Sequence, residues 1–250
     1  MCGRIIQKSP PDQLRLTILM GTPDDPRVTK AKARYNAAPS QELLIIRKHP
    51  KTGAFQQDLL RWGLIPNWIK EANPKTKPIN ATAERVASAP MFRQAYAKRR
   101  CIVPVDNFFE WKAIKGGPKQ PYAIALKSGQ PFGIAGIWEG WKHPNTGEIL
   151  RTFCIITCPA NELVGPIHDR MPVILPPKTY ERWLANVEPD PRDLLVSFPA
   201  EQMMMWPIST RVNKPDNDDP DILEPLDPVE RGPPTGKHWA AMDLFDLSTA

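Results

Sequence analysis

Proline is the feature that most limits what this chain can fold into. The sequence has 30 prolines among its 250 residues, or 12%, whereas about 5% is usual. Proline fixes φ and lacks the N–H that helices and sheet ladders need. The prolines are spread over the whole chain. We therefore expect short strands joined by many fixed loops, and not one disordered tract.

Hydrophobic runs separated by turn residues give the expected elements. Strands are predicted at 101–112, 120–127, 132–141, 151–158 and 203–208, after a hairpin built from the runs 43–46 and 59–62. Short helices are predicted from Ser9 to Gly21 and at 89–98, 178–186 and 191–197, with a long loop over 66–80. This pattern favours the α+β class, as a single domain on a curved, mostly antiparallel β-sheet or barrel-like core with short flanking helices. We place the domain at 1–228 and an acidic, proline-rich tail at 229–250.

Charge is divided unevenly along the chain. The net charge is +6, but residues 213–250 hold only three basic residues against nine acidic ones. Residues 1–212 therefore carry 30 basic (33 less 3) and 18 acidic (27 less 9) residues, a net of +12. A basic body is typical of a surface that binds a polyanion such as nucleic acid, although such a charge also serves solubility alone. No apolar stretch approaches the length of a membrane span, so we expect a cytoplasmic protein, nucleoid-associated when bound to DNA.

The four cysteines are too sparse for a disulfide framework. Cys154 and Cys158 share one face of a predicted strand, and no histidine is grouped with them at zinc-ligand spacing. We interpret them as buried core residues, and we expect no metal and no cofactor.

Cys2 is the residue with distinctive chemistry. Once Met1 is removed, Cys2 carries both an α-amine with a pKa of ~7.7–8 and a thiol with a pKa of ~8.5. A terminal aminothiol condenses with an aldehyde to an imine and then closes to a five-membered thiazolidine. Without further support, Cys2 is better explained as a small residue at a frayed terminus.

Six short motifs, in this order, resemble the SOS-response-associated peptidase (SRAP) family, the abasic-site processing proteins. The resemblance covers roughly residues 1–226. The motifs are Met1-Cys2-Gly3-Arg4, Arg34-Tyr35-Asn36-Ala37-Ala38-Pro39, Trp62-Gly63-Leu64-Ile65-Pro66, Ile79-Asn80-Ala81 with Glu84, Phe108-Phe109-Glu110-Trp111 and Ile167-His168-Asp169-Arg170-Met171-Pro172.

The resemblance implies a mainly β fold that binds single-stranded DNA and couples Cys2 to the aldehyde of an abasic site, shielding the lesion during the DNA damage (SOS) response. It implies Cys2 as nucleophile, with Asn80, Glu110 and His168 beside it. Burial between aromatic residues would make Glu110 a proton shuttle, and His168 would act on the sugar ring oxygen. Without the motifs, these residues would be interpreted as a strand-surface carboxylate, a turn-capping histidine and a turn asparagine. Peptidase activity would be limited to removal of Met1, and a lyase step is left open.

DNA contacts are expected from basic and aromatic side chains that bind phosphates or stack on bases. The candidates are Arg4, Asn36, Trp68, Arg85, Phe92, Arg93 and Arg170. This chain has Thr82 where many family members have arginine, and Arg85 is the candidate replacement. We expect a monomer whose partner is single-stranded DNA containing abasic sites, without membrane association.

Two other functions remain as alternatives. Class II glutamine amidotransferases also begin Met-Cys-Gly, but they carry a His-Arg-Gly motif that this chain lacks. A non-catalytic reader of single-stranded or modified DNA, in which Cys2 is incidental, would leave no adduct that survives denaturation.

Overall fold

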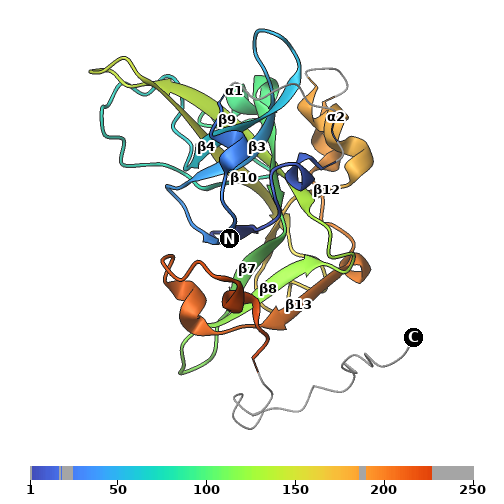
Figure 1. The fold of residues 1–250 in the computed structure, drawn as a ribbon. Helices are drawn as coiled ribbons and strands as arrows, with labels where there is room; N and C mark the ends of the chain where they lie inside the picture. The colour runs from blue at the N-terminus through green and yellow to red at the C-terminus, as the bar shows by residue number, and fades with distance from the viewer. Residues whose placement is uncertain (1, 17, 19–24, 186–189, 227–250) are drawn as a thin grey trace.

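The computed structural model describes residues 2–16, 18, 25–185 and 190–226, and the fold there is mostly β (Figure 1). The strands are β1 (Ile5–Gln7), β2 (Arg34–Ala37), β3 (Glu42–Lys48), β4 (Phe55–Trp62), β5 (Asn80–Thr82), β6 (Arg100–Val105), β7 (Asn107–Lys112), β8 (Gln120–Leu126), β9 (Phe132–Lys142), β10 (Ile149–Pro159), β11 (Arg170–Pro172), β12 (Ile174–Leu175) and β13 (Met203–Pro207). The α-helices are α1 (Arg93–Lys98) and α2 (Tyr180–Leu184). Short 3₁₀ helices lie at Gln13–Arg15, Val28–Lys30, Pro177–Thr179, Pro191–Leu194, Ala200–Gln202, Thr210–Asn213 and Pro220–Leu223.

Five strands close into a barrel. The order β10-β4-β3-β6-β9 returns to β10 through the β9–β10 hairpin, and every pairing in the ring is antiparallel except β4–β10. Closure leaves no free edge among these five strands. The barrel occupies the upper half of Figure 1, with β7, β8 and β13 below it. The expected single domain with a barrel-like core is thus confirmed.

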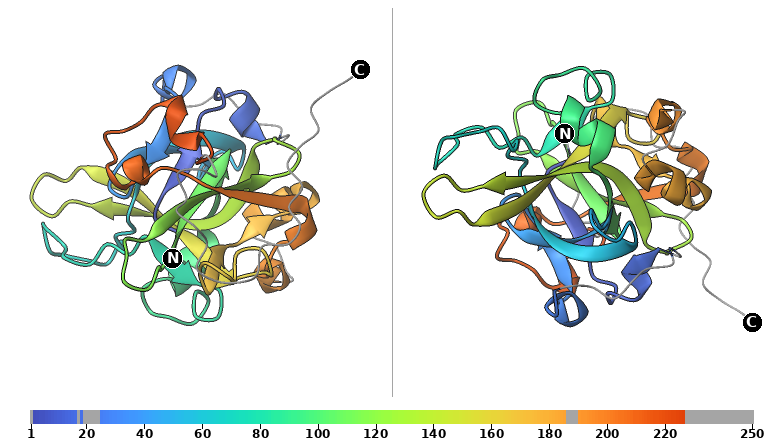
Figure 2. Two further views of the ribbon diagram at one scale, coloured as in Figure 1. Left: turned by 90° about the horizontal axis from the view of Figure 1, so that it is seen from below. Right: turned by 90° about the horizontal axis from the view of Figure 1, so that it is seen from above.

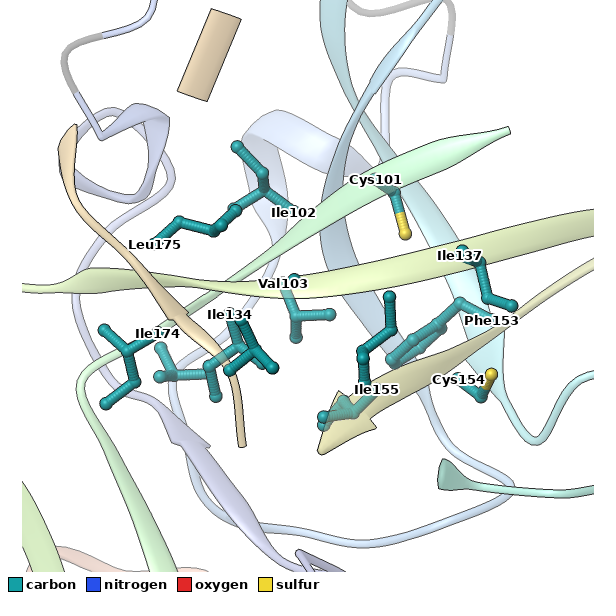
Figure 3. Packing of buried hydrophobic residues seen from close by; sticks show 14 of the residues in the cluster. Cys101, Ile102, Val103, Ile134, Ile137, Phe153, Cys154, Ile155, Ile174 and Leu175 are labelled. Atoms are coloured by element: carbon teal, nitrogen blue, oxygen red, sulfur yellow. The ribbon is translucent and has the colours of Figure 1, made fainter. Parts of the chain in front are cut away.

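The barrel interior is filled by branched and aromatic side chains from facing strands (Figure 3). The residues labelled there include Val103, Ile134, Phe153 and Ile155, all buried. On the outer side of β9, Gly133 lets α2 pack closely, because a Cβ there would lie 2.7 Å from a side-chain carbon of Ile102 and 2.8 Å from the ring of Tyr180. Valine, isoleucine and phenylalanine fill the interior, and glycine at position 133 makes room for the helix outside it.

A second sheet brings the N-terminal segment to the site. Its order is β13-β8-β7-β1-β2, with Ile5 of β1 opposite Phe108 of β7. The N–H of Phe109 donates to the carbonyl of Arg4 at 3.0 Å, which lays residues 2–4 beside the outer part of β7. Two short strands of the barrel sheet, β5 and β11, both pair with the end of β10. Asn80 of β5 donates a hydrogen bond to the carbonyl of Cys2, so that both sheets contribute to the site.

Most predicted elements are confirmed. The hairpin is β3–β4, and the strands from 120 onward are β8, β9, β10 and β13. The single strand expected at 101–112 is instead β6 and β7, divided at Asp106. The carboxylate of Asp106 accepts hydrogen bonds from the backbone N–H groups of Lys8 and Ser9, which anchors a turn there.

The helix expected from Ser9 to Gly21 is wrong for the described residues. Only Gln13–Arg15 forms a short 3₁₀ helix, which ends at Leu16 with φ of 56°. Ser9 bonds to Asp106 and does not cap the helix. Residues 17 and 19–24 lie outside the described part of the chain. The helices at 89–98, 178–186 and 191–197 are present in shortened form.

All four cysteines are buried free thiols, as expected for Cys154 and Cys158. No helix in the described ranges has the length and apolar character needed to cross a bilayer. The proposed tail at 229–250 lies outside the described residues.

Two long loops project from the same side of the barrel (Figure 2). One is the turn between β9 and β10, and the other is the segment between β4 and β5. The indole N–H of Trp141 in β9 donates to the carbonyl of Ile69 at 2.8 Å, which ties the two together. This second segment is the long loop expected at 66–80, and it carries Trp68.

Candidate active site

Cys2 is held in the interior immediately before β1. Its exposed fraction is 0%, and the side-chain amide of Asn80 donates to its carbonyl oxygen at 2.9 Å. Asn80 is the first residue of β5 and lies opposite Ile155 of β10, so the barrel fixes its position. Burial, and then the nearby charge of Glu110, raise the pKa of the Cys2 thiol well above its usual range. The thiol is therefore protonated at neutral pH and needs a base in order to react.

Glu110 supplies a titratable carboxyl group beside Cys2. It belongs to β7, and its exposed fraction is only 2%. Burial raises its pKa from 4.5 to about 7. The completely buried Phe109 and half-buried Trp111 flank it in the strand. At neutral pH this carboxyl group is thus divided between its proton-donating and proton-accepting forms, as general acid–base catalysis requires.

His168 lies in the loop between β10 and β11. Its Nδ1 accepts a hydrogen bond from the backbone N–H of Arg170 at 2.9 Å, while a carboxylate oxygen of Asp169 lies 2.9 Å from the same nitrogen. A backbone N–H can only donate, so the neutral ring carries its proton on Nε2, and the contact with Asp169 becomes an ion pair only when the ring is protonated. Burial lowers the pKa of His168. The neutral ring is therefore the prevailing form near pH 7, with Nε2–H as a donor.

Glu110 and His168 face a common pocket of about 500 Å³. Its other lining residues are Trp111, Lys119 and Asn213. The indole N–H of Trp111 donates to the side-chain oxygen of Asn213 at 2.8 Å, which fixes one wall. Sequence reasoning missed Lys119 and Asn213 as site residues. The one sequence signal for Lys119 was its place in the turn directly before a predicted strand, which follows the strand of Glu110.

Two candidate DNA-binding residues are engaged inside the protein. Asn36 is completely buried, and its amide donates to the carbonyls of Val212, Lys214 and Asn217. Its oxygen accepts a hydrogen bond at 2.7 Å from Arg4, whose guanidinium also bonds the carbonyl of Val212 at 2.6 Å. The observed role of both residues is to hold the segment after β13 against the N-terminal strand.

Arg170 is also internally paired. Its guanidinium forms two hydrogen bonds with the carboxylate of Glu84, at 2.8 and 2.9 Å, and another with the carbonyl of Thr157. These contacts clamp β11 onto the segment that follows β5. Because they join the strands that carry Asn80 and lead from His168, they stabilise the geometry of the site.

The remaining candidates are accessible. Arg85 and Arg93 are exposed, and Phe92 is half-buried against the core. All three lie in successive turns after β5, linked by backbone hydrogen bonds from Arg85 through Ala89. Trp68 lies apart from them in the long loop between β4 and β5, with an exposed fraction of 49%. The structure thus collects Cys2, Asn80, Glu110 and His168, and it places the accessible basic and aromatic groups in two other segments.

Comparisons with known proteins identify the family of the chain and relatives with a similar fold. Residues 1–215 match the family model described as SOS response associated peptidase (SRAP). The abasic site processing protein YoqW of Bacillus subtilis (strain 168) is 42% identical over 193 residues, which cover 76% of this chain and 85% of YoqW. The abasic site processing protein YedK of Escherichia coli (strain K12) is 30% identical over 231 residues, covering 90% of this chain and 100% of YedK. A crystal structure of a protein from Bacteroides thetaiotaomicron superimposes with a TM-score of 0.77 at 28% identity, covering 90% of this chain and 100% of that chain.

Proposed function

The chain belongs to the SOS response associated peptidase family, and on that premise we propose that it captures abasic sites in single-stranded DNA as a covalent cross-link to Cys2. The observation that carries the proposal is the buried Cys2 beside Glu110, which has a pKa near 7 and lines a pocket together with His168. The relatives are named abasic site processing proteins, which indicates the lesion that Cys2 would attack. An abasic sugar is an aldehyde once its ring opens.

The reaction begins with hydrolysis of the Met1–Cys2 peptide bond, which frees the α-amine of Cys2. This amine adds to C1′ of the ring-opened sugar to give a carbinolamine, and loss of one water gives an imine. The thiol then adds across the C=N bond, so that Sγ bonds to C1′ and its proton passes to the nitrogen. The balance is one aldehyde and one aminothiol giving one thiazolidine and one water, with no change of oxidation state.

Glu110 is suited to move the protons in these steps. In its neutral form it donates a proton to the departing hydroxyl group, and as a carboxylate it accepts the thiol proton. That second step needs a base because burial raises the pKa of the Cys2 thiol. Asn80 holds the Cys2 backbone in place through its hydrogen bond to the carbonyl oxygen.

His168 is suited to act on the sugar. The hydrogen bond at Nδ1 leaves the neutral ring with a proton on Nε2, which can be donated to the ring oxygen as the sugar opens. Ring opening and ring closure are the same step in opposite directions, so His168 also serves reversal of the cross-link.

The DNA strand is expected to pass the exposed Arg85 and Arg93, with Phe92 and Trp68 available for stacking. Arg85 is the proposed phosphate contact in place of the arginine that Thr82 replaces. Each neutralised phosphate releases counterions, so affinity for a single strand is expected to fall steeply as salt rises, largely independently of base sequence.

The experiment is intact mass spectrometry of the protein after incubation with abasic single-stranded DNA. We expect one species with the mass of the protein lacking Met1 plus the DNA, less one water. Cys2→Ala should lose this denaturation-resistant adduct and retain only an imine that borohydride traps. Cys101→Ala, which removes a thiol inside the barrel, is the matched control and should retain the adduct.

A wild-type yield of stable adduct from Cys2→Ala would refute the mechanism. DNA binding with no adduct from the wild-type protein would instead indicate a non-catalytic reader. A parallel glutaminase assay tests the amidotransferase alternative, and we expect no glutamate release.

A further inference from the structure

Lys119 lines the same pocket as Glu110 and His168, and no step of the proposed reaction uses it. It ends the turn between β7 and β8, immediately before Gln120, which pairs with Lys112 across the hairpin. Glu110 reaches the pocket from β7 and His168 from the loop before β11. The β7–β8 turn, which carries Lys119, is therefore a third segment that lines the pocket.

Lys119 carries a positive charge that no residue in the described part of the chain pairs with. The residue is exposed, and its side chain makes no ion pair or hydrogen bond with any of the residues that the structure describes. It lies near the reacting groups, because it lines the same pocket as Glu110 and His168. Burial is the main cause of the lowered pKa of His168, and the positive charge of Lys119 is a minor one. The other lining groups do not neutralise it: Trp111 and Asn213 are uncharged, and Glu110 is only partly ionised near pH 7.

An abasic nucleotide brings a matching negative charge to this place. C1′ must enter the pocket to reach Cys2, and the phosphodiesters on either side of the sugar remain attached to it. These phosphates keep their charge whatever the state of the aldehyde. A lysine ammonium is a compact charge with three donors on a flexible stem, which suits a phosphate oxygen at the rim of a pocket.

We propose that Lys119 binds a phosphodiester that flanks the abasic sugar and thereby holds the open sugar in the pocket. This inference rests on the proposed function, since it assigns a binding residue for the same site. Lys119 is therefore a lesion-positioning contact, distinct from the general basic surface that binds intact single strands.

The test uses unreactive binding first. Affinities are measured for a single strand carrying a tetrahydrofuran abasic analogue, which has no aldehyde, and for an intact strand of the same sequence. Lys119→Ala should reduce the preference for the analogue strand about tenfold, the loss expected for one charge-assisted contact near the surface. Lys119→Arg should restore most of it. Lys115→Ala is the matched control, because Lys115 is an exposed lysine in the same turn that does not line the pocket.

Cross-linking rates then provide a second readout with reactive abasic DNA. For Lys119→Ala, the DNA concentration giving half the maximal rate should rise about tenfold, while for Lys115→Ala it should stay within twofold of wild type. Equal effects of the two alanine variants would overturn the proposal, because the contribution would then be general charge. Failure of arginine to restore binding would also overturn it.

One further outcome would replace the role altogether. If borohydride traps DNA on Lys119 in the Cys2→Ala protein, as shown by peptide mass, Lys119 acts as an amine nucleophile and not as a phosphate contact. The wild-type protein shows which of the two proposals fails. If it forms no adduct, cross-linking itself is refuted. If it forms a normal adduct and the Lys119 variants behave like wild type, only this inference is refuted.

Discussion

Replacing Glu110 by glutamine should change the pH dependence of stability in a direction that the structure fixes. The folded protein raises the pKa of Glu110 from 4.5 to about 7 because burial disfavours the carboxylate. The folded state therefore holds the proton more tightly than the unfolded state. The contribution of the protonated Glu110 to the free energy of unfolding is fully present below pH 4.5, declines as the pH rises, and is lost above pH 7.

The magnitude follows from the two pKa values. A difference of about 2.5 at 1.36 kcal/mol for each unit gives a loss of about 3 kcal/mol between pH 4.5 and pH 8. Glutamine does not ionise, so Glu110→Gln lacks this loss. We expect the variant to gain about 3 kcal/mol relative to wild type over that interval, whatever constant cost the amide itself imposes.

The assay is urea denaturation of both proteins at half-unit steps from pH 4.5 to pH 8, with the free energy of unfolding compared at each pH. Glu148→Gln, an exposed position in the β9–β10 turn, is the control and should run parallel to wild type. The same Glu110→Gln protein should form the cross-link about 10²- to 10⁴-fold more slowly. Parallel pH curves for Glu110→Gln and wild type would refute the claim that burial tunes this carboxyl group.

Three other substitutions test the site and its support. His168→Ala should slow release of the adduct into competitor abasic DNA by about 10²-fold or more between pH 5 and 8, with a smaller effect on formation; unchanged release with collapsed DNA affinity would make His168 a binding residue. Asn36→Ala should lower the free energy of unfolding by about 3 kcal/mol in urea, because the half-buried Arg4 and three backbone carbonyls each lose a hydrogen bond; a loss of DNA affinity without a loss of stability would contradict this. Gly133→Ala should cost about 1–3 kcal/mol by thermal or urea unfolding, since its Cβ would lie 2.7 Å from the nearest side-chain carbon, whereas Gly140→Ala in the same strand, with 3.6 Å available, should be nearly neutral.

The sequence predicted those elements whose signal is local. The β3–β4 hairpin has two apolar runs joined by a turn with Pro50 and Gly53, and both strands appear where expected. Glu110 was expected to have a raised pKa through burial in an aromatic strand, and it is buried with a pKa raised to about 7. The helix expected from Ser9 fails because Asp106, far along the chain, takes the Ser9 side chain and N–H.

The candidate site shows the same division. The motifs identified Cys2, Asn80, Glu110 and His168, and the fold brings these four residues together. They did not reveal that Asn36 is an internal anchor, because its partners lie beyond Val212. The single hydrogen bond that sets the tautomer of His168 is also invisible in a list of residues.

The sequence by itself determined which reactive groups are present: a cysteine at position 2, a carboxyl group among aromatic residues, and a basic body. Tertiary structure decided which of these groups meet. The parallel pairing of β4 with β10, which contributes to closing the barrel, joins residues about ninety positions apart. Lys119 lines the pocket because β8 pairs antiparallel with β7 and because the loop between β10 and β11 places His168 at the same pocket. Such contacts depend on chain closure over long separations, and no local pattern of hydrophobicity or charge encodes them.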